Sequence, residues 1–456
     1  MDHQTLPLLD RADLVVCGGG TAGAFCALAA AEAGADVLLV EQFGSLGGSA
    51  TNALVLPIMH NHMEENPQCS YLAKKLLDRL KKEGGCSRDG LNFDPVLLAF
   101  ILEEMCLSAG VRILYHTFLA GAVCKDGLLQ SAMVANKAGL SRIEGKLFAD
   151  CTGDGDLSVF AGAAFQKGNP ETGKNQPVSL RYLVGGVDKE VFGNFILEES
   201  KRTGKTADGG YWDGNIYAAV TNKEDQVFFD LFDKAIRAGD LTEDDRIYWQ
   251  LFPVAGREDT LAFNNPEFFE DCDGTDPYQL SRIQCKGKQA ILRQMRFYRR
   301  YFKGFEKAYL SSVAPMVGVR ESRNIQTRYL LTAKDLLEKR KFADGVCQSN
   351  YPVDIHGRAL CFDLKTIAPP ADGKNWYEIP YRSLVVKGID NLLVAGRCLG
   401  AEFLVQSSLR VQHTCRATGE AAGIAAALCL QQEILPGELD GKEVRARMEA
   451  LGAHFS

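Results

Sequence analysis

The amino-acid sequence predicts an α/β fold joined to a second domain of α+β type. Within residues 13–41 a strand, a glycine turn, an alanine-rich helix and another strand follow one another. Residues 118–150 form short alternating runs separated by turn residues, which predicts a β-meander. The chain has 456 residues, and one hydrophobic core supports only ~250–300, so we expect at least two domains.

The composition is that of a globular protein and disfavours a nucleic-acid partner. Hydrophobic residues make up 46% of the chain and charged residues 24%, which is enough apolar surface for packed cores. The formal net charge of −7 opposes binding to phosphate backbones. The densest basic segment, residues 293–303, has apolar side chains at helical spacing, so we expect a solvated amphipathic helix there.

Hydropathy and cysteine spacing indicate a soluble protein with reduced thiols. No segment approaches the ~20 apolar residues of a bilayer span, and the first residues do not resemble a signal peptide. We therefore expect a cytoplasmic protein without a membrane span. Of the 14 cysteines, the closest pair in sequence is Cys17 and Cys26, so no C-x-x-C motif exists for zinc or disulfide exchange. No metal site is predicted, and most thiols are expected to be buried.

The remaining elements complete the predicted domain organisation. After the first strand–helix–strand unit, which ends its helix at Gly34, we expect helices at residues 71–82 and 95–109 and a strand at 111–116. The middle is more polar, with strands near residues 178–184. A buried strand at 391–397 and a helix at 409–430 return to the first pattern. These features predict a discontinuous domain of residues 1–165 and 311–456, and a substrate or cap domain of residues 166–310.

The glycine turn carries a dinucleotide-binding fingerprint. Gly18, Gly20 and Gly23 form G-x-G-x-x-G between the strand and the helix. The first glycine permits the tight turn, the second lets the backbone approach a pyrophosphate, and the third lets helix and strand pack closely. Thr21 and Ala22 begin the helix, whose N-terminus would face the phosphates. Glu41 ends the second strand, where a carboxylate can accept hydrogen bonds from a ribose. We therefore predict a Rossmann-type domain.

Further segments resemble a known flavoprotein family. They are EQFGSLGGSATNALV (41–55), FADCTGDGDLSVFAGA (148–163), GVRESRNIQTRYLLTAKDLL (318–337), PVDIH (352–356), YEIPYRSLV (377–385), NLLVAGRCLG (391–400) and SLRVQHTCRATGEAAGIAAAL (408–428). Together they resemble the FAD-dependent oxidoreductases with a glutathione-reductase-like fold, in the fumarate reductase and succinate dehydrogenase branch. The resemblance implies a three-layer FAD-binding domain that contains the β-meander.

The resemblance also implies which residues hold FAD. Residues that would approach the pyrophosphate and the ribityl chain, or close the site from the meander side, are Gly47, Gly48, Ser49, Gly153, Asp154, Gly396 and Arg397. The helix near residue 409, with Arg410 and Val411 at its start, would point its positive N-terminal end at the flavin pyrimidine. The chain departs from the family pattern at His413, which would add a proton carrier beside the flavin.

Oxidation of a C–H bond by a flavin requires a nearby base, so the histidines are the first candidates. His413 is the first choice and His356 of PVDIH the second; their alternative roles are a structural histidine and a loop histidine tied to Asp354. His60 and His62 are weaker candidates for the substrate side.

Two further groups of charged residues are candidates. Arg320, Glu321 and Arg323 form R-E-S-R, which suits either a clamp for a substrate carboxylate or an ion-pair network between the domains. Glu402 and Arg410 flank the last strand-to-helix connection and are lesser candidates.

Three functions remain open from the sequence. The first is a dehydrogenase or oxidase that moves a hydride between a small hydroxylated or carboxylated metabolite and flavin N5. The second is a fumarate-reductase-like C=C reductase, and the third is a flavin-binding module without turnover. No second G-x-G-x-x-G follows a later strand, so a separate NAD(P)H domain is not expected. The expected partners are FAD, a small-molecule substrate and an unidentified electron acceptor or donor; the oligomeric state stays open.

Overall fold

The N-terminal unit has the predicted strand–helix–strand form. The computed structural model describes residues 6–59, 69–205, 209–212, 215–220, 224, 226–356 and 373–456. β1 (Leu8–Cys17) and β2 (Val37–Val40) are parallel neighbours, and α1 (Thr21–Glu32) connects them. Gly34 has a φ of +95°, which ends the helix in the left-handed region as predicted.

A seven-stranded sheet contains both the parallel strands and the meander. Its order is β3-β2-β1-β6-β5-β4, and β19 pairs with β6. The added strands are β3 (Arg112–Leu114), β4 (Phe118–Lys125), β5 (Leu128–Asn136), β6 (Gly139–Asp150) and β19 (Leu392–Val394). β6 is parallel to β1 and β19 but antiparallel to β5. This long strand therefore joins the predicted meander to the parallel sheet, and it brings residues 392–394 beside residues 148–150.

The helices of this part agree with the predictions except at one place. α2 (Tyr71–Lys82) and α3 (Pro95–Ser108) occupy the predicted ranges. The single helix expected at 409–430 is instead α10 (Phe403–Leu409) followed by α11 (Gln412–Gln432). Val411 adopts an extended conformation (φ −67°, ψ 152°), so it ends one helix and starts the next. The expectation that the long helix begins near residue 409 was therefore wrong by three residues.

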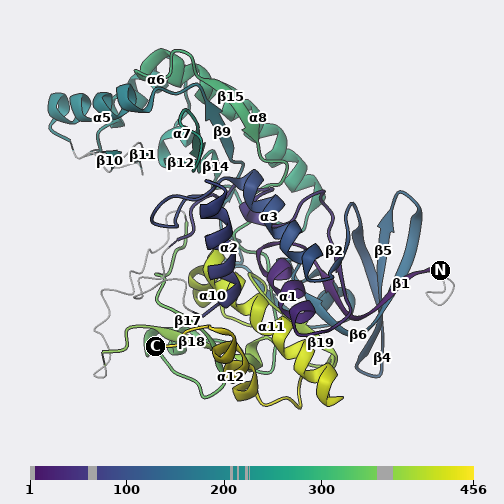
Figure 1. Cartoon of the computed structure of the whole chain (residues 1–456). Helices are drawn as coiled ribbons and strands as arrows, with labels where there is room; N and C mark the ends of the chain where they lie inside the picture. Colours follow the sequence, from purple (N-terminus) through teal and green to yellow (C-terminus); the bar gives the residue numbers. More distant parts are fainter. Residues whose placement is uncertain are drawn as a thin grey trace.

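α1 and α11 lie side by side with almost no space between their backbones (Figure 1). A Cβ atom added to Gly419 would lie 2.1 Å from the Ala22 carbonyl oxygen, and one added to Gly423 would lie 2.1 Å from that of Cys26. Because Ala22 pairs with Gly419 and Cys26 with Gly423, the two helices run in the same direction. Gln412 starts α11 seven residues before Gly419, so α11 extends about 10 Å further toward its N-terminus than α1 does.

The middle of the chain forms a second sheet with its own helices, at the top of Figure 1. The strand order is β10-β11-β12-β13-β9-β15. The strands are β9 (Tyr182–Gly185), β10 (Gly209–Trp212), β11 (Asn215–Val220), β12 (Trp249–Pro253), β13 (Leu261–Phe263) and β15 (Tyr309–Val313). The helices are α5 (Lys189–Thr203), α6 (Phe229–Arg237), α7 (Asp244–Ile247) and α8 (Pro277–Tyr301). α8 contains most of the basic segment, and its Phe297 and Tyr298 are buried, so the predicted amphipathic helix is confirmed.

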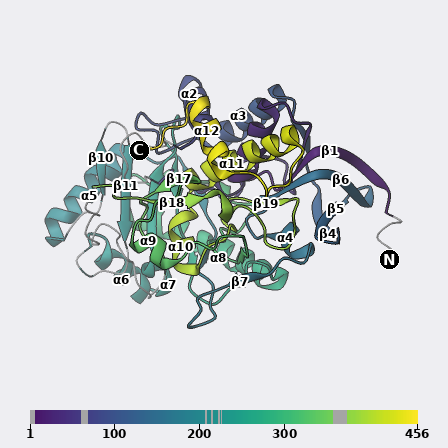
Figure 2. The ribbon, with the colours of Figure 1, turned by 90° about the horizontal axis from the view of Figure 1, so that it is seen from below.

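The remaining elements lie outside the two large sheets. They are α4 (Asp156–Phe160), β7 (Phe165–Lys167), β8 (Val178–Ser179), β14 (Glu267–Phe268), β16 (Arg323–Ile325), α9 (Ala333–Leu337), β17 (Gly345–Ser349), β18 (Tyr377–Pro380) and α12 (Gly441–Leu451). In Figure 2, α10 lies next to α11 and to the β17–β18 pair. Most cysteines of the described residues are buried, as predicted. Within the described ranges, no helix is both long and apolar enough to cross a membrane.

The contact between α1 and α11 gives a prediction for stability. Gly419→Ala and Gly423→Ala should each lower the free energy of unfolding by about 2 kcal/mol, because the added methyl group overlaps a backbone carbonyl that has no room to move. Denaturant unfolding measures the change. Gly-to-Ala substitutions in an unconstrained helix stabilise by roughly 0.5–1 kcal/mol, so an increase in stability would contradict the close packing.

Candidate functional site

Two of the three fingerprint glycines leave no room for a Cβ atom, and the remaining one, Gly20, is an open position with room for one. A Cβ atom on Gly18 (φ +93°) would lie 2.6 Å from the Cys151 carbonyl oxygen, and one on Gly23 would lie 1.7 Å from that of Gly18. Gly20 has an ordinary φ of −72°, and its Cβ would meet only the Gly48 Cα atom, at 3.7 Å. The first and third glycines are therefore required by the fold itself. Gly20 instead keeps the space before α1 free, as close approach of a pyrophosphate requires.

A second glycine loop packs against the first. The Gly47 N–H donates to the Gly19 carbonyl oxygen (2.9 Å), and the Thr21 hydroxyl donates to the Gly47 carbonyl oxygen (3.2 Å). Gly48 has a φ of +53°, and a Cβ there would lie 2.7 Å from the Gly20 Cα atom. Ser49 follows in a 3-10 turn, Gly48–Ala50. The predicted residues 18–23 and 47–49 thus form one cradle of backbone.

Glu41 ties this cradle to the end of β2. Its Oε2 accepts a hydrogen bond from the Gly19 N–H (2.7 Å) and its Oε1 accepts one from the Phe43 N–H (2.8 Å). Burial raises the pKa of Glu41, although these hydrogen bonds oppose the rise. Each carboxylate oxygen can accept a further hydrogen bond, so the predicted contact with a ribose is compatible with this geometry.

Two helix N-termini face the region without a side chain that caps them. α1 begins after Gly20 and α11 after Val411; neither helix has a side-chain cap or an acidic residue in its first turn. The positive end of each helix dipole and its N–H groups are therefore suited to anionic groups. Since α11 extends about 10 Å beyond α1, one molecule with two electron-rich groups at that separation would contact both ends. The residues present thus fit a flavin dinucleotide.

Asp154 connects the meander side to the last strand. Its Oδ1 accepts hydrogen bonds from the Ser322 hydroxyl (2.5 Å) and the Arg397 guanidinium (2.8 Å), and a Cβ on Gly153 would lie 3.1 Å from the same guanidinium. Arg323 donates to the Asp154 carbonyl oxygen and pairs with Asp156. Gly396, in the left-handed region at φ +85°, turns the chain toward Arg397. The predicted residues 153, 154, 396 and 397 therefore lie together.

A second group of charged side chains lies at the junction between α10 and α11. We call it the arginine–carboxylate cluster, and it consists of Arg181, Glu267, Arg320, Asp354, His356 and Arg410. One Glu267 oxygen pairs with Arg320 (2.9 Å) and with His356 Nδ1 (2.8 Å). Asp354 pairs with His356 Nε2 (3.4 Å) and with Arg410 (2.9 Å). His356 is thus held between two carboxylates, each of which also contacts an arginine.

Burial and nearby positive charges have opposite effects on the pKa values of the two carboxylates in this cluster. Burial raises the pKa of Glu267, but the charge of Arg320 and the hydrogen bond from His356 outweigh it and hold the pKa below its usual value. Asp354 behaves in the same way, with Arg410 as the main cation that lowers its pKa. Burial and the nearby charge of Arg320 lower the pKa of Arg181 to about 9. The cluster therefore contains ionised carboxylates and an arginine whose charge is poorly compensated.

Several buried polar atoms of the cluster and its rim have no hydrogen-bond partner among the described residues. They are Arg181 Nε, Arg320 Nη2, Arg410 Nε, Glu267 Oε2, Gln176 Oε1 and Asn264 Oδ1. The Gln176 amide is linked to the cluster through Gln406: it donates a hydrogen bond to Gln406, which donates one to the Arg320 carbonyl oxygen. The Asn264 amide is linked through Tyr248: it donates a hydrogen bond to the Tyr248 hydroxyl, and the centres of the Tyr248 and His356 rings lie 5.2 Å apart. Buried polar groups are ordinarily satisfied, so these atoms point to a bound molecule.

The structure separates the residues of R-E-S-R. Arg320 joins the arginine–carboxylate cluster, whereas Arg323 joins Asp154 and Asp156. Glu321 accepts hydrogen bonds from the Gly168 N–H (2.9 Å) and the Asn175 amide (2.6 Å). Because consecutive residues of an extended segment point in opposite directions, the motif does not form a single clamp. Outside the motif, Glu402 accepts from the Ala333 N–H and so supports the start of α9.

Of the other histidine candidates, His413 lies among the described residues and is buried. His413 lies in the first turn of α11 and is only 2% exposed. Burial lowers its pKa to about 4, although a hydrogen bond with the Gln348 backbone opposes the shift. At neutral pH His413 is therefore uncharged and a weak base. His60 and His62 lie outside the described residues.

The sequence did not indicate Arg181 or Glu267. Arg181 stands in SLRYLVGG and Glu267 in NNPEFFED, and neither segment forms a recognisable motif. Pairing of β8 with β14, with Ser179 opposite Glu267, brings the two segments together. The one available signal was the charge of Arg181 within the mostly apolar run of residues 178–184.

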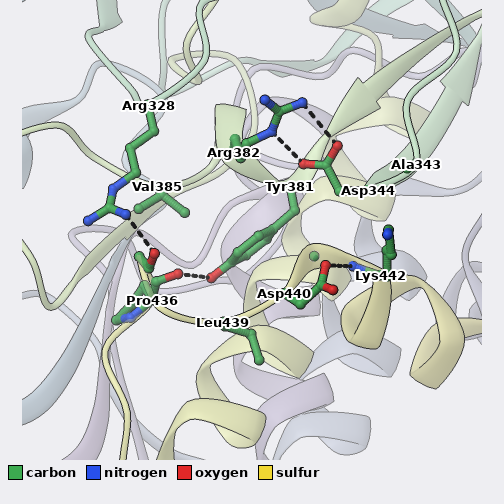
Figure 3. Close-up of a pocket in the computed structure, with 12 residues that line it drawn as sticks. Arg328, Ala343, Asp344, Tyr381, Arg382, Val385, Pro436, Leu439, Asp440 and Lys442 are labelled. Atoms are coloured by element: carbon green, nitrogen blue, oxygen red, sulfur yellow. Dashed lines mark hydrogen bonds and ion pairs between the residues drawn. The ribbon is translucent and has the colours of Figure 1, made fainter.

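A hollow of about 300 Å³ lies elsewhere, between residues 381–385 and the start of α12 (Figure 3). Its polar groups bond to one another: Arg382 pairs with Asp344, Arg328 donates to the Gly437 carbonyl oxygen, and Tyr381 donates to that of Pro436. None of the residues proposed for the cradle or the cluster lines it. Within the described residues, no group of three or more metal-binding side chains occurs.

The comparisons with known proteins identify the class. The model of the family described as FAD dependent oxidoreductase matches residues 13–448. The protein is therefore a flavoprotein enzyme that uses FAD for redox chemistry. It belongs to the FAD-dependent oxidoreductase family.

Three solved structures illustrate the similarity of the chain to known proteins, which is at low identity and with TM-scores below 0.5. A flavoprotein/dehydrogenase from Cytophaga hutchinsonii has a TM-score of 0.48 at 11% identity, with 97% of this chain and 93% of that chain covered. The myxobacterial chondrochloren halogenase has a TM-score of 0.49 at 12% identity, with 96% and 78% covered. The p-nitrophenol 4-monooxygenase of Pseudomonas putida has a TM-score of 0.47 at 11% identity, with 97% and 87% covered. No curated protein matches the chain in sequence.

The open position of the glycine turn gives a prediction for FAD binding. Gly20→Ala should fold as well as the wild type, because its Cβ meets only ordinary contacts, but the methyl group should weaken FAD binding at least ~10-fold by occupying the approach to the pyrophosphate. Gly23→Ala is the control and should lose stability as well as FAD. Visible absorbance and denaturant unfolding of both variants measure this. Equal FAD affinity in Gly20→Ala and the wild type would contradict the cradle.

The buried His413 gives a prediction for pH dependence. The unfolded chain takes up the proton near pH 6.5 and the folded protein near pH 4, so His413 lowers the free energy of unfolding as the pH falls between these values, by up to about 3 kcal/mol. His413→Gln should lose less stability than the wild type between pH 7 and pH 5, because Gln carries no titratable proton. Denaturant midpoints across this range test it. Identical pH profiles would show that His413 is not buried in neutral form.

Proposed function

We propose that the protein is a dehydrogenase or oxidase that moves a hydride between a small polar metabolite, hydroxylated or carboxylated, and flavin N5. One observation carries this proposal: Arg410 of the arginine–carboxylate cluster directly precedes Val411, at which the uncapped N-terminus of α11 begins. Groups that can bind a polar substrate and accept its proton therefore adjoin the helix end that would face the flavin pyrimidine.

Residues of the two glycine loops would hold FAD. In this proposal the backbone at Gly18, Gly20, Gly47 and Gly48 approaches the pyrophosphate and the Glu41 carboxylate accepts from the adenosine ribose. Residues 153, 154, 396 and 397 would lie along the ribityl chain. FAD, when bound, supplies the two-electron acceptor of the reaction. The fit rests on the open position at Gly20 and on the two uncapped helix ends.

We assign the proton transfer to His356 in this reaction. Glu267 lies 2.8 Å from His356 Nδ1, so it orients the ring and leaves Nε2 to exchange protons with the substrate. Asp354 lies 3.4 Å from Nε2, a distance that permits a substrate hydroxyl to take its place. Arg320 keeps Glu267 ionised, and the resulting carboxylate stabilises the imidazolium that forms. His413, with its low pKa, is the less suitable base.

Residues 166–310 would act as a cap over this site. Arg181, Tyr248 and Glu267 come from this part of the chain, and Asp354, His356 and Arg410 come from the other. The ion pair between Glu267 and His356 therefore joins the two parts. Closure of such a cap over a bound substrate would exclude water during hydride transfer.

One observation favours a second function, C=C reduction in the manner of fumarate reductases. There an arginine gives the substrate a proton, which requires a lowered pKa, and burial beside Arg320 lowers the pKa of Arg181 to about 9. Reoxidation of the chemically reduced protein by enoates, but not by ketones or keto acids, would favour this function.

The assignment of His356 is tested by substitution. His356→Asn should slow flavin reduction by substrate 10²- to 10⁴-fold, because a positioned base contributes about that factor, while FAD stays bound. His413→Gln serves as the control and should reduce within a few-fold of the wild-type rate. Stopped-flow absorbance of the anaerobic proteins gives both rates. A His356→Asn variant that reduces at the wild-type rate would remove His356 from the mechanism.

A further inference from the structure

We infer that the substrate is a small hydroxy acid with a single carboxylate, bound by Arg181, Arg320 and Arg410, with its hydroxyl group directed at His356. This inference rests on the proposed function and narrows its substrate. It depends on the charge of the cluster and on which of its buried atoms lack partners.

The cluster has one positive charge in excess. Three guanidinium groups face two carboxylates, Glu267 and Asp354, and His356 must be neutral when the substrate binds because it then accepts a proton. Arg320 and Arg410 each pair with one of these carboxylates. Arg181 has no carboxylate within 4.0 Å in the part of the chain that the structure describes, and it is 8% exposed. A buried charge without a counter-charge is costly, so a ligand with one negative charge would complete the cluster.

The unpaired donors show how that charge is recognised. Each of the three arginines has one buried N–H nitrogen without a hydrogen-bond acceptor among the described residues: Arg181 Nε, Arg320 Nη2 and Arg410 Nε. A carboxylate accepts about four hydrogen bonds through its two oxygens, and guanidinium groups match its planar geometry. Phosphate esters carry close to two negative charges at neutral pH, so they exceed the charge available. A carboxylate is therefore the better match.

The unpaired acceptors add a second requirement. Glu267 Oε2, Gln176 Oε1 and Asn264 Oδ1 are buried and accept no hydrogen bond from any described residue. A simple fatty acid offers no donor to these oxygens, whereas each hydroxyl group offers one. An amino acid also offers donors, but its ammonium group cancels the charge of its carboxylate and leaves Arg181 uncompensated. The two sets of atoms together select a hydroxy acid.

The arrangement is consistent with oxidation of the hydroxyl-bearing carbon. Its C–H bond breaks with both electrons, which leave as hydride to the flavin, and the O–H proton passes to His356 Nε2. The C–O bond becomes a carbonyl, so the product is a keto acid and the flavin gains two electrons. Arg320 is one of the three arginines that would bind the substrate carboxylate, and it also pairs with Glu267, which orients His356. Neighbouring side chains therefore hold both the carboxylate and the hydroxyl group of the substrate.

Ligand binding to the FAD-bound protein tests the inference. The probes are L-lactate, D-lactate and glycerate as hydroxy acids, with propionate, malate, glycerol, alanine and glycerol 3-phosphate as the matched alternatives. Under anaerobic conditions the change in melting temperature reports binding, and bleaching of the flavin absorbance reports oxidation of the bound acid. At least one hydroxy acid should bind ~10-fold more tightly than every alternative. Preference for malate, glycerol 3-phosphate, alanine or glycerol would overturn the inference but leave the proposed redox function standing.

Arg181→Met tests the same inference through the protein. The substitution should weaken hydroxy-acid binding at least ~100-fold, leave the FAD absorbance unchanged and maintain or raise the melting temperature, because it removes a buried uncompensated charge. Arg237→Met, at a mostly exposed position of α6, is the control and should bind like the wild type. Undiminished binding by Arg181→Met would overturn the inference.

If Arg181→Met does not fold, Gln176→Met takes its place and should weaken the binding of hydroxy acids but not that of propionate. Protein that takes up no FAD would contradict the proposed function instead, and melting temperatures would still report acid binding.

Discussion

The contact between the backbones of α1 and α11 is the constraint on which the rest of the structure depends. Gly419 and Gly423 have no room for a side chain against Ala22 and Cys26, so the two helices have a fixed register as well as a fixed distance. That register sets the two uncapped N-termini about 10 Å apart along a common direction. Loss of either glycine would move the end of α11 relative to the glycine turn, and with it Arg410 and the arginine–carboxylate cluster.

The same register places the arginine–carboxylate cluster beside the N-terminus of α11. α10 ends at Arg410 and α11 starts after Val411, so the residue that contacts Asp354 is directly connected to the helix end that would stabilise negative charge on the flavin. Glu267 reaches this place from the separate β8–β14 pair, and Arg181 from the residues that link β8 to β9. The cluster is thus built from both parts of the chain around one buried carboxylate.

Much of the arrangement of the glycine cradle could be predicted from the sequence, because its determinants are local. G-x-G-x-x-G, Glu41 and the turn after β6 are short motifs whose backbone geometry follows from a few neighbouring residues. The structure brings Gly18, Gly20, Gly47 and Gly48 into one cradle, and Gly153, Asp154, Gly396 and Arg397 into another group.

The arginine–carboxylate cluster could be predicted only in part, because it depends on pairing between distant segments. Arg320 and His356 were recognised from motifs, but their partner Glu267 lies about fifty residues before the first and ninety before the second, in a strand of two residues. R-E-S-R read as one compact group, whereas its extended backbone sends Arg320 and Arg323 to different sites. The break at Val411 carries no proline or glycine, so the sequence favoured one continuous helix.

A crystal structure of the protein with FAD bound would show whether both helix ends contact one dinucleotide. We expect the pyrophosphate beside Gly20 and Gly48, and the pyrimidine edge of the flavin within hydrogen-bond distance of the first N–H groups of α11, with His356 on the substrate side of the ring. A dinucleotide bound with its flavin away from α11, or with its phosphates away from the start of α1, would contradict this binding mode.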